Sequence, residues 1–225
     1  MNETVLLAIR FKVEGSLRFL SHAETLKLFQ RACVRAGLAI RYSEGFNPRP
    51  KLSLPLPRSV GVESDEELLC LRVAHEPLTE DRATDEQRDL RIKEALARQL
   101  PEGCELISVS TAGAGTSFAP RSATYVFSVQ PEYVTEELEA TIERLLSSEH
   151  LPIRRPMDEE KTKFKNVDVR GFLKSIKLTD SSIITECAIS PAGSIRVEEI
   201  LTLLGLDEGK LAAAVRRTSV QWQND

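Results

Sequence analysis

The sequence predicts an α+β protein made of two halves with antiparallel sheets. Apolar side chains recur with a period of two in some segments and with helical spacing in others. In both halves a strand comes first and a helix second, and a helix and a strand come last, which is the split-βαβ, ferredoxin-like pattern. Small residues without periodicity, TAGAGTS, separate the halves. We therefore expect ferredoxin-like halves at 1–111 and 121–225, joined by a linker at 112–120.

The first half contains clear start and stop signals. Residues 4–13 change from an apolar run to strict alternation, which predicts a strand on a half-covered sheet. Ser21 is a favourable N-cap for a helix over 22–36, and Gly37 stands at its end. The other expected elements are strands at 38–43, 66–74 and 104–110, an edge or bulge in the proline-rich LSLPLP, and a helix at 85–100 with Thr84 and Gln87 in capping-box spacing.

The second half alternates in the same way. The expected strands lie at 123–129, within 159–169, at 176–180 and 183–189 as a hairpin, and at 218–222. Expected helices cover 132–147, 195–204 between Ser194 and Gly205, and 207–215. A basic segment bounded by prolines, LPIRRP, precedes the short strand. Each helix has one apolar stripe, so helices would cover one sheet face and leave the other for a domain, a sheet or a ligand.

Composition describes an ordinary globular protein. The 225 residues are 41% hydrophobic and 28% charged, enough for a core without disulfides. The N-terminal apolar run is too short for a signal peptide or a membrane span, which predicts a cytoplasmic protein without a membrane partner. The four cysteines are scattered without a CxxC pair, so we expect buried thiols and no metal or cofactor.

Charge is distributed unevenly along the chain. Residues 10–58 carry ten Lys or Arg against three Glu, a net of +7, and residues 154–177 have a net of +4. Residues 59–109 have a net of −7, and the whole chain has −4. Such runs are either solvated faces or local binding sites for a polyanion, because salt screens charges beyond about 8 Å.

The proline-rich stretch 41–57 is the strongest candidate site. Prolines fix their own φ and hold the preceding residue extended, so Asn47 and Arg49 project from a stiff backbone. Tyr42 and Phe46 could stack on bases, and Asn47 could read a base edge or hold the loop. Arg49 and Lys51, with Arg18 from the preceding segment, could meet phosphates. The alternative interpretation is a rigid connector with incidental charge.

Two further groups are candidates. His22, in the first turn of the first helix and preceded by Arg18, has the place of a general acid or base for phosphodiester chemistry; the alternative is a packed histidine. In the second half, Lys163 and Lys165 would share one face of a strand, with Arg170 following. They suit a phosphate-facing edge and equally a solvated edge protected by lysines.

Residues 17–64 resemble a known family. The motifs R-F-x-S-H, R-A-G-L, Y-S-x-G-F-N-P-x-P, L-P-L and G-x-E-S are similar to those of the bacterial radical-SAM-linked proteins, a family of unknown function. The resemblance implies a radical S-adenosylmethionine enzyme as partner, often in ribosome-related gene neighbourhoods. This chain lacks the CxxxCxxC that holds such an enzyme's cluster.

Three functions remain open from the sequence. The first is a non-catalytic accessory or substrate-binding protein that binds RNA and works with the radical-SAM enzyme in RNA- or ribosome-related modification. The second is a metal-independent endoribonuclease that uses His22. The third is a protein-interaction module whose proline-rich stretch docks the partner.

Overall fold

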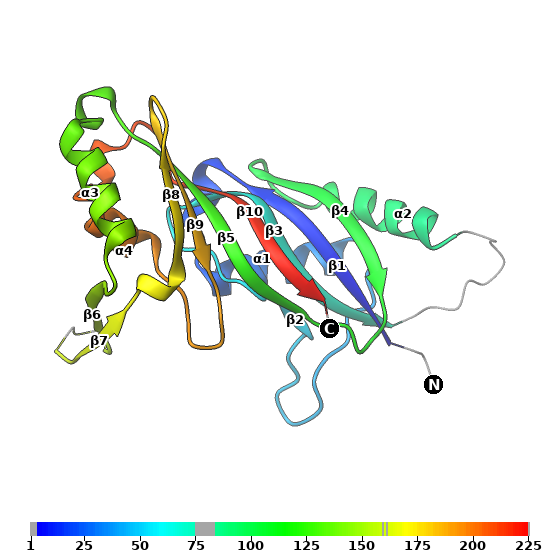
Figure 1. Ribbon diagram of the computed structural model, residues 1–225. Coiled ribbons are helices and arrows are strands. Elements are labelled where there is room, and N and C mark those ends of the chain that lie inside the picture. The colour runs from blue at the N-terminus through cyan, green and yellow to red at the C-terminus, as the bar shows by residue number, and fades with distance from the viewer. Residues whose placement is uncertain (1–3, 75–83, 159, 161, 225) are drawn as a thin grey trace. The chain divides into compact units, whose positions relative to one another are not determined.

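The computed structural model describes residues 4–74, 84–158, 160 and 162–224 (Figure 1). The chain forms two compact units, Met1–Ala119 with Trp222–Asp225, and Pro120–Gln221. Each unit contains antiparallel strand pairs and, among its described residues, two α-helices. The predicted α+β class is confirmed.

The first unit has its strands in the spatial order β4-β1-β3, and the short β2 also pairs with β3. All three pairings are antiparallel. Its elements are β1 (Thr4–Val13), the 3₁₀ helix η1 (Gly15–Phe19), α1 (His22–Arg35), β2 (Leu52–Ser53), β3 (Glu63–Ala74), α2 (Asp85–Ala97) and β4 (Cys104–Ala112).

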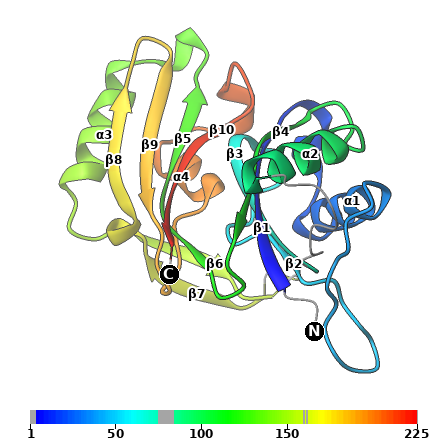
Figure 2. The same cartoon turned by 90° about the vertical axis from the view of Figure 1, so that its right-hand side faces the viewer.

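Alternation along β1 divides its side chains between two faces. Leu7, Ile9 and Phe11 are buried in a core with side chains of α1 and α2, which cover one face of the sheet (Figure 2). Leu6 and Ala8 point to the other face, where they join a smaller cluster that has no helix in it. This second face carries the pocket described below.

The predicted caps of the first unit are confirmed. The Ser21 hydroxyl accepts a hydrogen bond from the Glu24 amide, and the Glu24 carboxylate accepts one from the Ser21 amide. Thr84 and Gln87 form the same reciprocal pair at the start of α2. Gly37 follows α1 with φ of 75°, a conformation that glycine adopts without strain.

Gly103 joins the start of β4 to the end of β1. Its φ is 85°, and a Cβ there would lie 2.6 Å from the Glu14 carbonyl oxygen. We expect Gly103→Ala to lower the free energy of unfolding by about 2 kcal/mol, because the left-handed backbone and the clash both disfavour a side chain. Urea unfolding would measure it, with Gly115→Ala as control, since Gly115 has open space and no left-handed φ. Equal effects of both changes would contradict this account.

The second unit has the strand order β10-β5-β9-β8 and a separate β6–β7 hairpin. Its elements are β5 (Phe118–Ser128), η2 (Pro131–Tyr133), α3 (Glu136–Ser147), β6 (Pro152–Pro156), β7 (Phe164–Asp168), η3 (Arg170–Phe172), β8 (Leu173–Leu178), β9 (Ser182–Ala188), α4 (Val197–Leu203), η4 (Glu208–Lys210) and β10 (Arg216–Asn224). α3 packs beside β8, where Leu138, Ile142 and Leu145 are buried.

Several element predictions were wrong in detail. Residues 38–43 make only isolated bridges at Ile40 and Tyr42, not a strand. The expected helix at 207–215 is limited to η4, and α4 is capped by Arg196 instead of Ser194. Within LPIRRP, for which the sequence predicts no helix or strand, Pro152–Pro156 form β6. The short strand expected within 159–169 is β7; residues 159 and 161 lie outside the described part of the chain.

The finer organisation stays a prediction. The irregular stretch between β4 and β5 is 113–117, narrower than the linker expected at 112–120. Within each unit the strand pairings are antiparallel, but β2 has only two residues and the second unit has an additional hairpin. The ferredoxin-like organisation of each half therefore stays a prediction.

Candidate nucleic-acid interface

Residues 41–51 form a hairpin, which we call the proline hairpin. The Ser43 amide donates to the Arg49 carbonyl at 2.8 Å, and the Lys51 amide donates to the Arg41 carbonyl at 2.7 Å. The Ser43 hydroxyl also accepts from the Arg49 amide at 2.9 Å. Prolines lack the amide needed for a longer ladder, which explains why this segment is a hairpin with few bonds and not a strand of the sheet.

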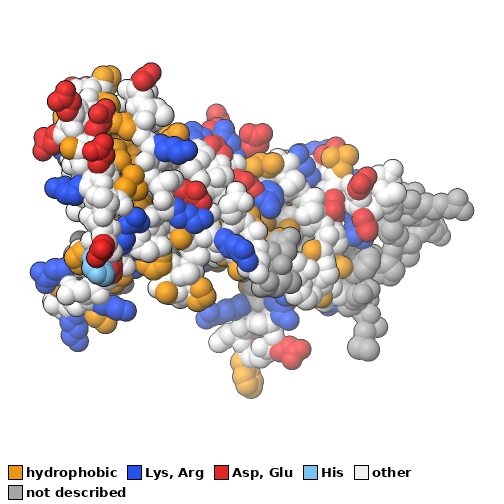
Figure 3. Space-filling view, in the orientation of Figure 1, with side chains coloured by type: hydrophobic (Ala, Val, Ile, Leu, Met, Phe, Trp, Pro, Cys, Tyr) orange, Lys and Arg blue, Asp and Glu red, His pale blue; other side chains and the backbone are white. Residues whose placement is uncertain are grey.

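The tip of the proline hairpin stands clear of the protein. All five residues from Glu44 to Pro48 are exposed, and the Phe46 ring is fully so. Gly45 has φ of 119°, which permits the turn that presents this ring. Figure 3 shows the protrusion below β2, ending in hydrophobic side chains. A fully exposed aromatic ring buries nothing in this fold, so folding stability does not account for it.

The base of the proline hairpin is fixed to β3. The Arg41 amide donates to the Arg72 carbonyl at 2.8 Å, and the Arg72 amide donates to the Lys51 carbonyl at 2.9 Å. Ser53 and Leu52 then pair with β3 as β2. Arg49 and Lys51 are exposed on this anchored frame. Their side chains are thus presented from an ordered backbone, which lowers the entropy cost of binding.

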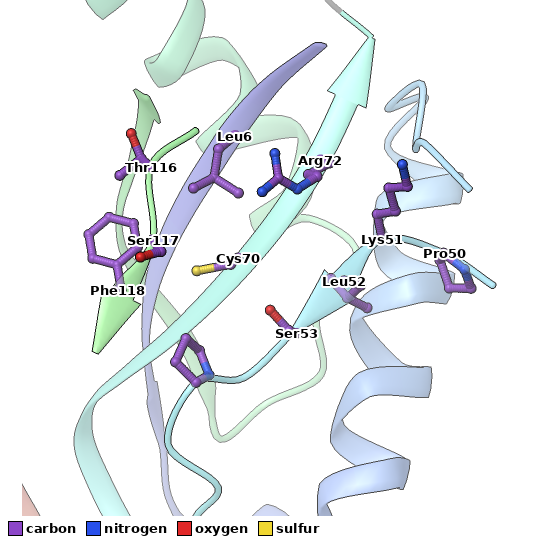
Figure 4. A pocket seen from close by; sticks show the side chains of 11 residues that line it. Leu6, Pro50, Lys51, Leu52, Ser53, Cys70, Arg72, Thr116, Ser117 and Phe118 are labelled. Carbon is purple, nitrogen blue, oxygen red and sulfur yellow. The ribbon is translucent and has the colours of Figure 1, made fainter. Parts of the chain in front are cut away.

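A pocket of about 410 Å³ lies directly beside the hairpin base (Figure 4). It opens on the sheet face away from the helices, over Leu6 and Cys70. Pro50 and Lys51 of the hairpin form one wall, and residues 116–118 form the opposite one. Among the residues that the structure describes, Lys51 and Arg72 line the pocket and no Asp or Glu does, so the lining favours an anion.

The pocket includes residues that sequence reasoning missed. Arg72 is the one cation in the apolar run LLCLRVA, and it alternates with Cys70 on the same face; that pattern is a readable signal. Its guanidinium donates to the Ala114 carbonyl. Residues 116–118 lie within the linker expected at 112–120, and nothing in the sequence marks them as a wall of a pocket.

His22 does not share this site. It lines a separate small cavity with Phe11 and Val13, at the end of β1. The hairpin base lies beside Arg72, which pairs with Leu6 near the start of β1. Five residues of strand separate Leu6 from Phe11, about 17 Å at the usual rise. His22 and the proline hairpin are therefore two separate candidates and do not form one site.

His22 is exposed, and two arginines near it, Arg18 and Arg58, bind backbone carbonyl groups. The cavity is about 10 Å³, room for roughly one water molecule. Arg58 beside it donates to the carbonyl oxygens of Arg18 and Leu20, at 2.6 and 3.4 Å. Arg18 donates to the Gly15 carbonyl at 3.0 Å and stacks over Phe19, with its guanidinium carbon 4.4 Å from the ring centroid.

The basic residues of the second unit are placed on and beside β7. Lys163 and Lys165 are exposed, and Lys165 lies opposite Arg155 in the β6–β7 pairing. The Arg154 guanidinium carbon lies 4.6 Å from the Phe164 centroid, an exposed cation and ring together. Blue side chains gather over β6 and β7 in Figure 3. These residues and the proline hairpin belong to different units.

Arg170 has a clear structural role. Its guanidinium donates to the carbonyl oxygens of Leu146, Ser148 and Leu173 at 2.7 to 2.9 Å, which satisfies the C-terminal end of α3. Among the second unit's predicted contacts, the exposed Lys163 and Lys165 are the better placed to reach a ligand.

Asp168, two residues before Arg170, makes the folding stability of the second unit depend on pH in the acid range. The amides of Arg170 and Leu151 donate to its Oδ1, and His150 Nδ1 lies 2.7 Å from Oδ2; these bonds lower the pKa of Asp168 to about 2. A lowered pKa stabilises the fold above the unfolded value near ~3.9, and that contribution is lost as pH falls toward the folded value. We expect Asp168→Asn, whose Oδ1 still accepts both amides, to flatten the decline in stability between about pH 4 and pH 2. Urea titrations across this range would measure it, and an unchanged slope would contradict it.

The cysteines are inert at neutral pH. Burial raises the pKa of Cys33, Cys104 and Cys187 to about 12 and that of Cys70 to about 11. All four are free thiols. Within the described ranges, no three His, Cys, Asp or Glu side chains are grouped to hold a metal ion, and no helix is long and apolar enough to cross a membrane.

The fold and the site together define an α+β protein with an anchored cationic hairpin beside a pocket suited to anions. The chain belongs to a family described as uncharacterized protein conserved in bacteria (DUF2344), whose model matches residues 7–201. The expected bacterial family of unknown function is confirmed at that level; its link to a radical-SAM enzyme stays a prediction.

Other comparisons add little. No curated protein matches the chain. Among solved structures it is similar to one titled "Crystal Structure of an Unknown Protein from Galdieria sulphuraria", at 12% identity over 99% of each chain with a TM-score of 0.25. A TM-score of this size establishes neither a shared fold nor a shared function.

Proposed function

We propose that this protein binds single-stranded RNA through the proline hairpin and acts as a non-catalytic accessory subunit. The observation that carries the proposal is the fully exposed Phe46 ring, held on a hairpin whose base is bonded to β3. Aromatic rings on cationic frames bind unpaired bases by stacking, and every base has a face that can stack.

In this proposal each residue makes the kind of contact that its side chain allows. Phe46 stacks on a base, and the half-exposed Tyr42 at the hairpin base offers a second ring. Arg49 and Lys51 neutralise phosphates, Arg49 with two parallel hydrogen bonds. Asn47 at the tip presents an amide that can pair with a base edge. Lys163 and Lys165, in the second unit, are exposed and are separate candidates for phosphate contacts.

The partner in this proposal is a radical-SAM enzyme, from the resemblance of residues 17–64 to the radical-SAM-linked proteins. This chain would hold the RNA or ribosomal substrate while the enzyme performs the radical step. The nuclease alternative has less support: His22 is exposed, but the cavity that it lines is only about 10 Å³ and is not a pocket of nucleotide size.

Fluorescence anisotropy with a labelled single-stranded RNA tests the proposal. We expect saturable binding at low salt and competition by unlabelled single-stranded RNA, with weaker competition by duplex RNA, whose bases are not free to stack. A protein that binds the radical-SAM enzyme through the proline hairpin but shows no RNA affinity would instead be an interaction module, and that result would overturn the proposal.

A further inference from the structure

We propose that the pocket beside the proline hairpin binds a single nucleotide, with its base in the pocket and its phosphate at Lys51 and Arg72. This inference rests on the proposed function in one respect: the nucleotide is taken to belong to the RNA strand that the hairpin holds. The volume of about 410 Å³ lies within the range of small-ligand sites.

The floor and sides of the pocket suit a flat ring. Leu6 and Cys70 form the floor, almost fully buried themselves, while Pro55 and Phe118 close the sides. Figure 4 shows the Phe118 ring and the Cys70 sulfur bordering the same open space. Apolar and aromatic walls of this kind bind a base by stacking and exclusion of water.

The two cations give the pocket its preference for an anion. Arg72 extends along the pocket over Leu6, held by its bond to the Ala114 carbonyl (Figure 4). Lys51 is exposed on the hairpin wall, and no ion pair of its ammonium group is found among the described residues. A phosphate between a fixed guanidinium and a mobile ammonium would gain charge-assisted hydrogen bonds from both.

Hydroxyl groups complete the lining. Ser53, on β2, and Ser117, on the opposite wall, both reach the open space in Figure 4. Thr116 adds a third hydroxyl, on a turn in which the Thr116 amide donates a hydrogen bond to the Gly113 carbonyl at 3.0 Å. Hydroxyls both donate and accept, which matches the ribose and the mixed edge of a base. An apolar floor, two cations and neutral hydroxyls fit a nucleotide better than a fatty acid or a simple inorganic anion.

Amide chemical shifts of the isotope-labelled full chain, titrated with adenosine monophosphate, test the inference. We expect saturable shifts at Ser53, Cys70 and Thr116, and at least about tenfold weaker binding of adenosine, which lacks the phosphate. Ser53→Phe should abolish the pocket shifts because it fills the space from an exposed position, and Lys51→Ala should weaken binding about tenfold. Ser59→Phe, at an exposed serine outside the pocket, is the matched control and should bind normally.

The outcomes separate this inference from the proposed function. No saturable shift in the pocket, shifts unaffected by Ser53→Phe, or equal shifts with inorganic phosphate alone would overturn it. RNA binding that persists in a protein without nucleotide binding would leave the hairpin proposal standing and refute the pocket. Nucleotide binding in the pocket without RNA affinity would support the pocket site and refute the proposal that the hairpin binds RNA.

Discussion

Replacing Phe46 with alanine should lower the affinity for single-stranded RNA by about tenfold or more, because one stacked base contributes about 1–3 kcal/mol. The free energy of unfolding should not change, since the ring is fully exposed and packs against nothing. Anisotropy and urea unfolding on the same preparation measure both effects.

Phe46→Trp is the matched variant for this change. It keeps an aromatic face and should bind RNA at least as well as the natural protein, because indole offers a larger stacking surface. Wild-type RNA affinity in Phe46→Ala would contradict the role of this ring. A large loss of stability in Phe46→Ala would show that the ring supports the fold and would remove the observation on which the proposal depends.

Phe29→Ala should produce the largest loss of stability, about 3–5 kcal/mol. Phe29 is fully buried on α1, and its ring centroid lies 4.5 Å from that of Phe11 on β1. Truncation would leave a cavity between helix and sheet and remove an aromatic pair. Phe46→Ala is the same exchange at an exposed position and serves as its control.

Urea unfolding measures the effect of Phe29→Ala, and the m value shows whether the native state remains compact. A loss below about 1 kcal/mol would mean that α1 is not packed on β1 as described. Because α1 also supports the chain that leads into the proline hairpin, RNA affinity of this variant should be measured only where it is folded.

Local signals predicted the helices of the first unit well and its irregular segments poorly. Ser21 with Glu24, and Thr84 with Gln87, satisfy helix amides through side chains three residues away, so a short window of sequence contains the whole interaction. The apolar content of residues 38–43 predicts a strand. The prolines that follow have no amide hydrogen to donate to a neighbouring strand, so the segment forms only isolated bridges.

The candidate site likewise contains residues that the sequence identifies and residues that only the fold brings together. The prolines and cations of the hairpin are adjacent in sequence, so Phe46, Arg49 and Lys51 could be identified without the fold. The pairing of β2 with β3 brings Arg72 to these residues, and the turn after β4 brings Ser117. Both residues are distant from the hairpin in sequence. His22 and the hairpin flank the same helix, α1, but lie at its opposite ends, so their closeness in sequence does not bring them together.

The central claim, that the proline hairpin contacts RNA phosphates, is tested most directly by the salt dependence of RNA affinity. Wild-type protein and the variant Arg49→Ala with Lys51→Ala are compared between about 50 and 200 mM salt. Each phosphate contact on a single strand contributes about 0.7 to the slope of log affinity against log salt, so the double variant should bind more weakly with a slope smaller by about 1.4. Lys27→Ala with Arg31→Ala, exposed on α1, should retain the wild-type slope. An unchanged slope in the hairpin variant, or no RNA binding by the natural protein at low salt, would contradict the account.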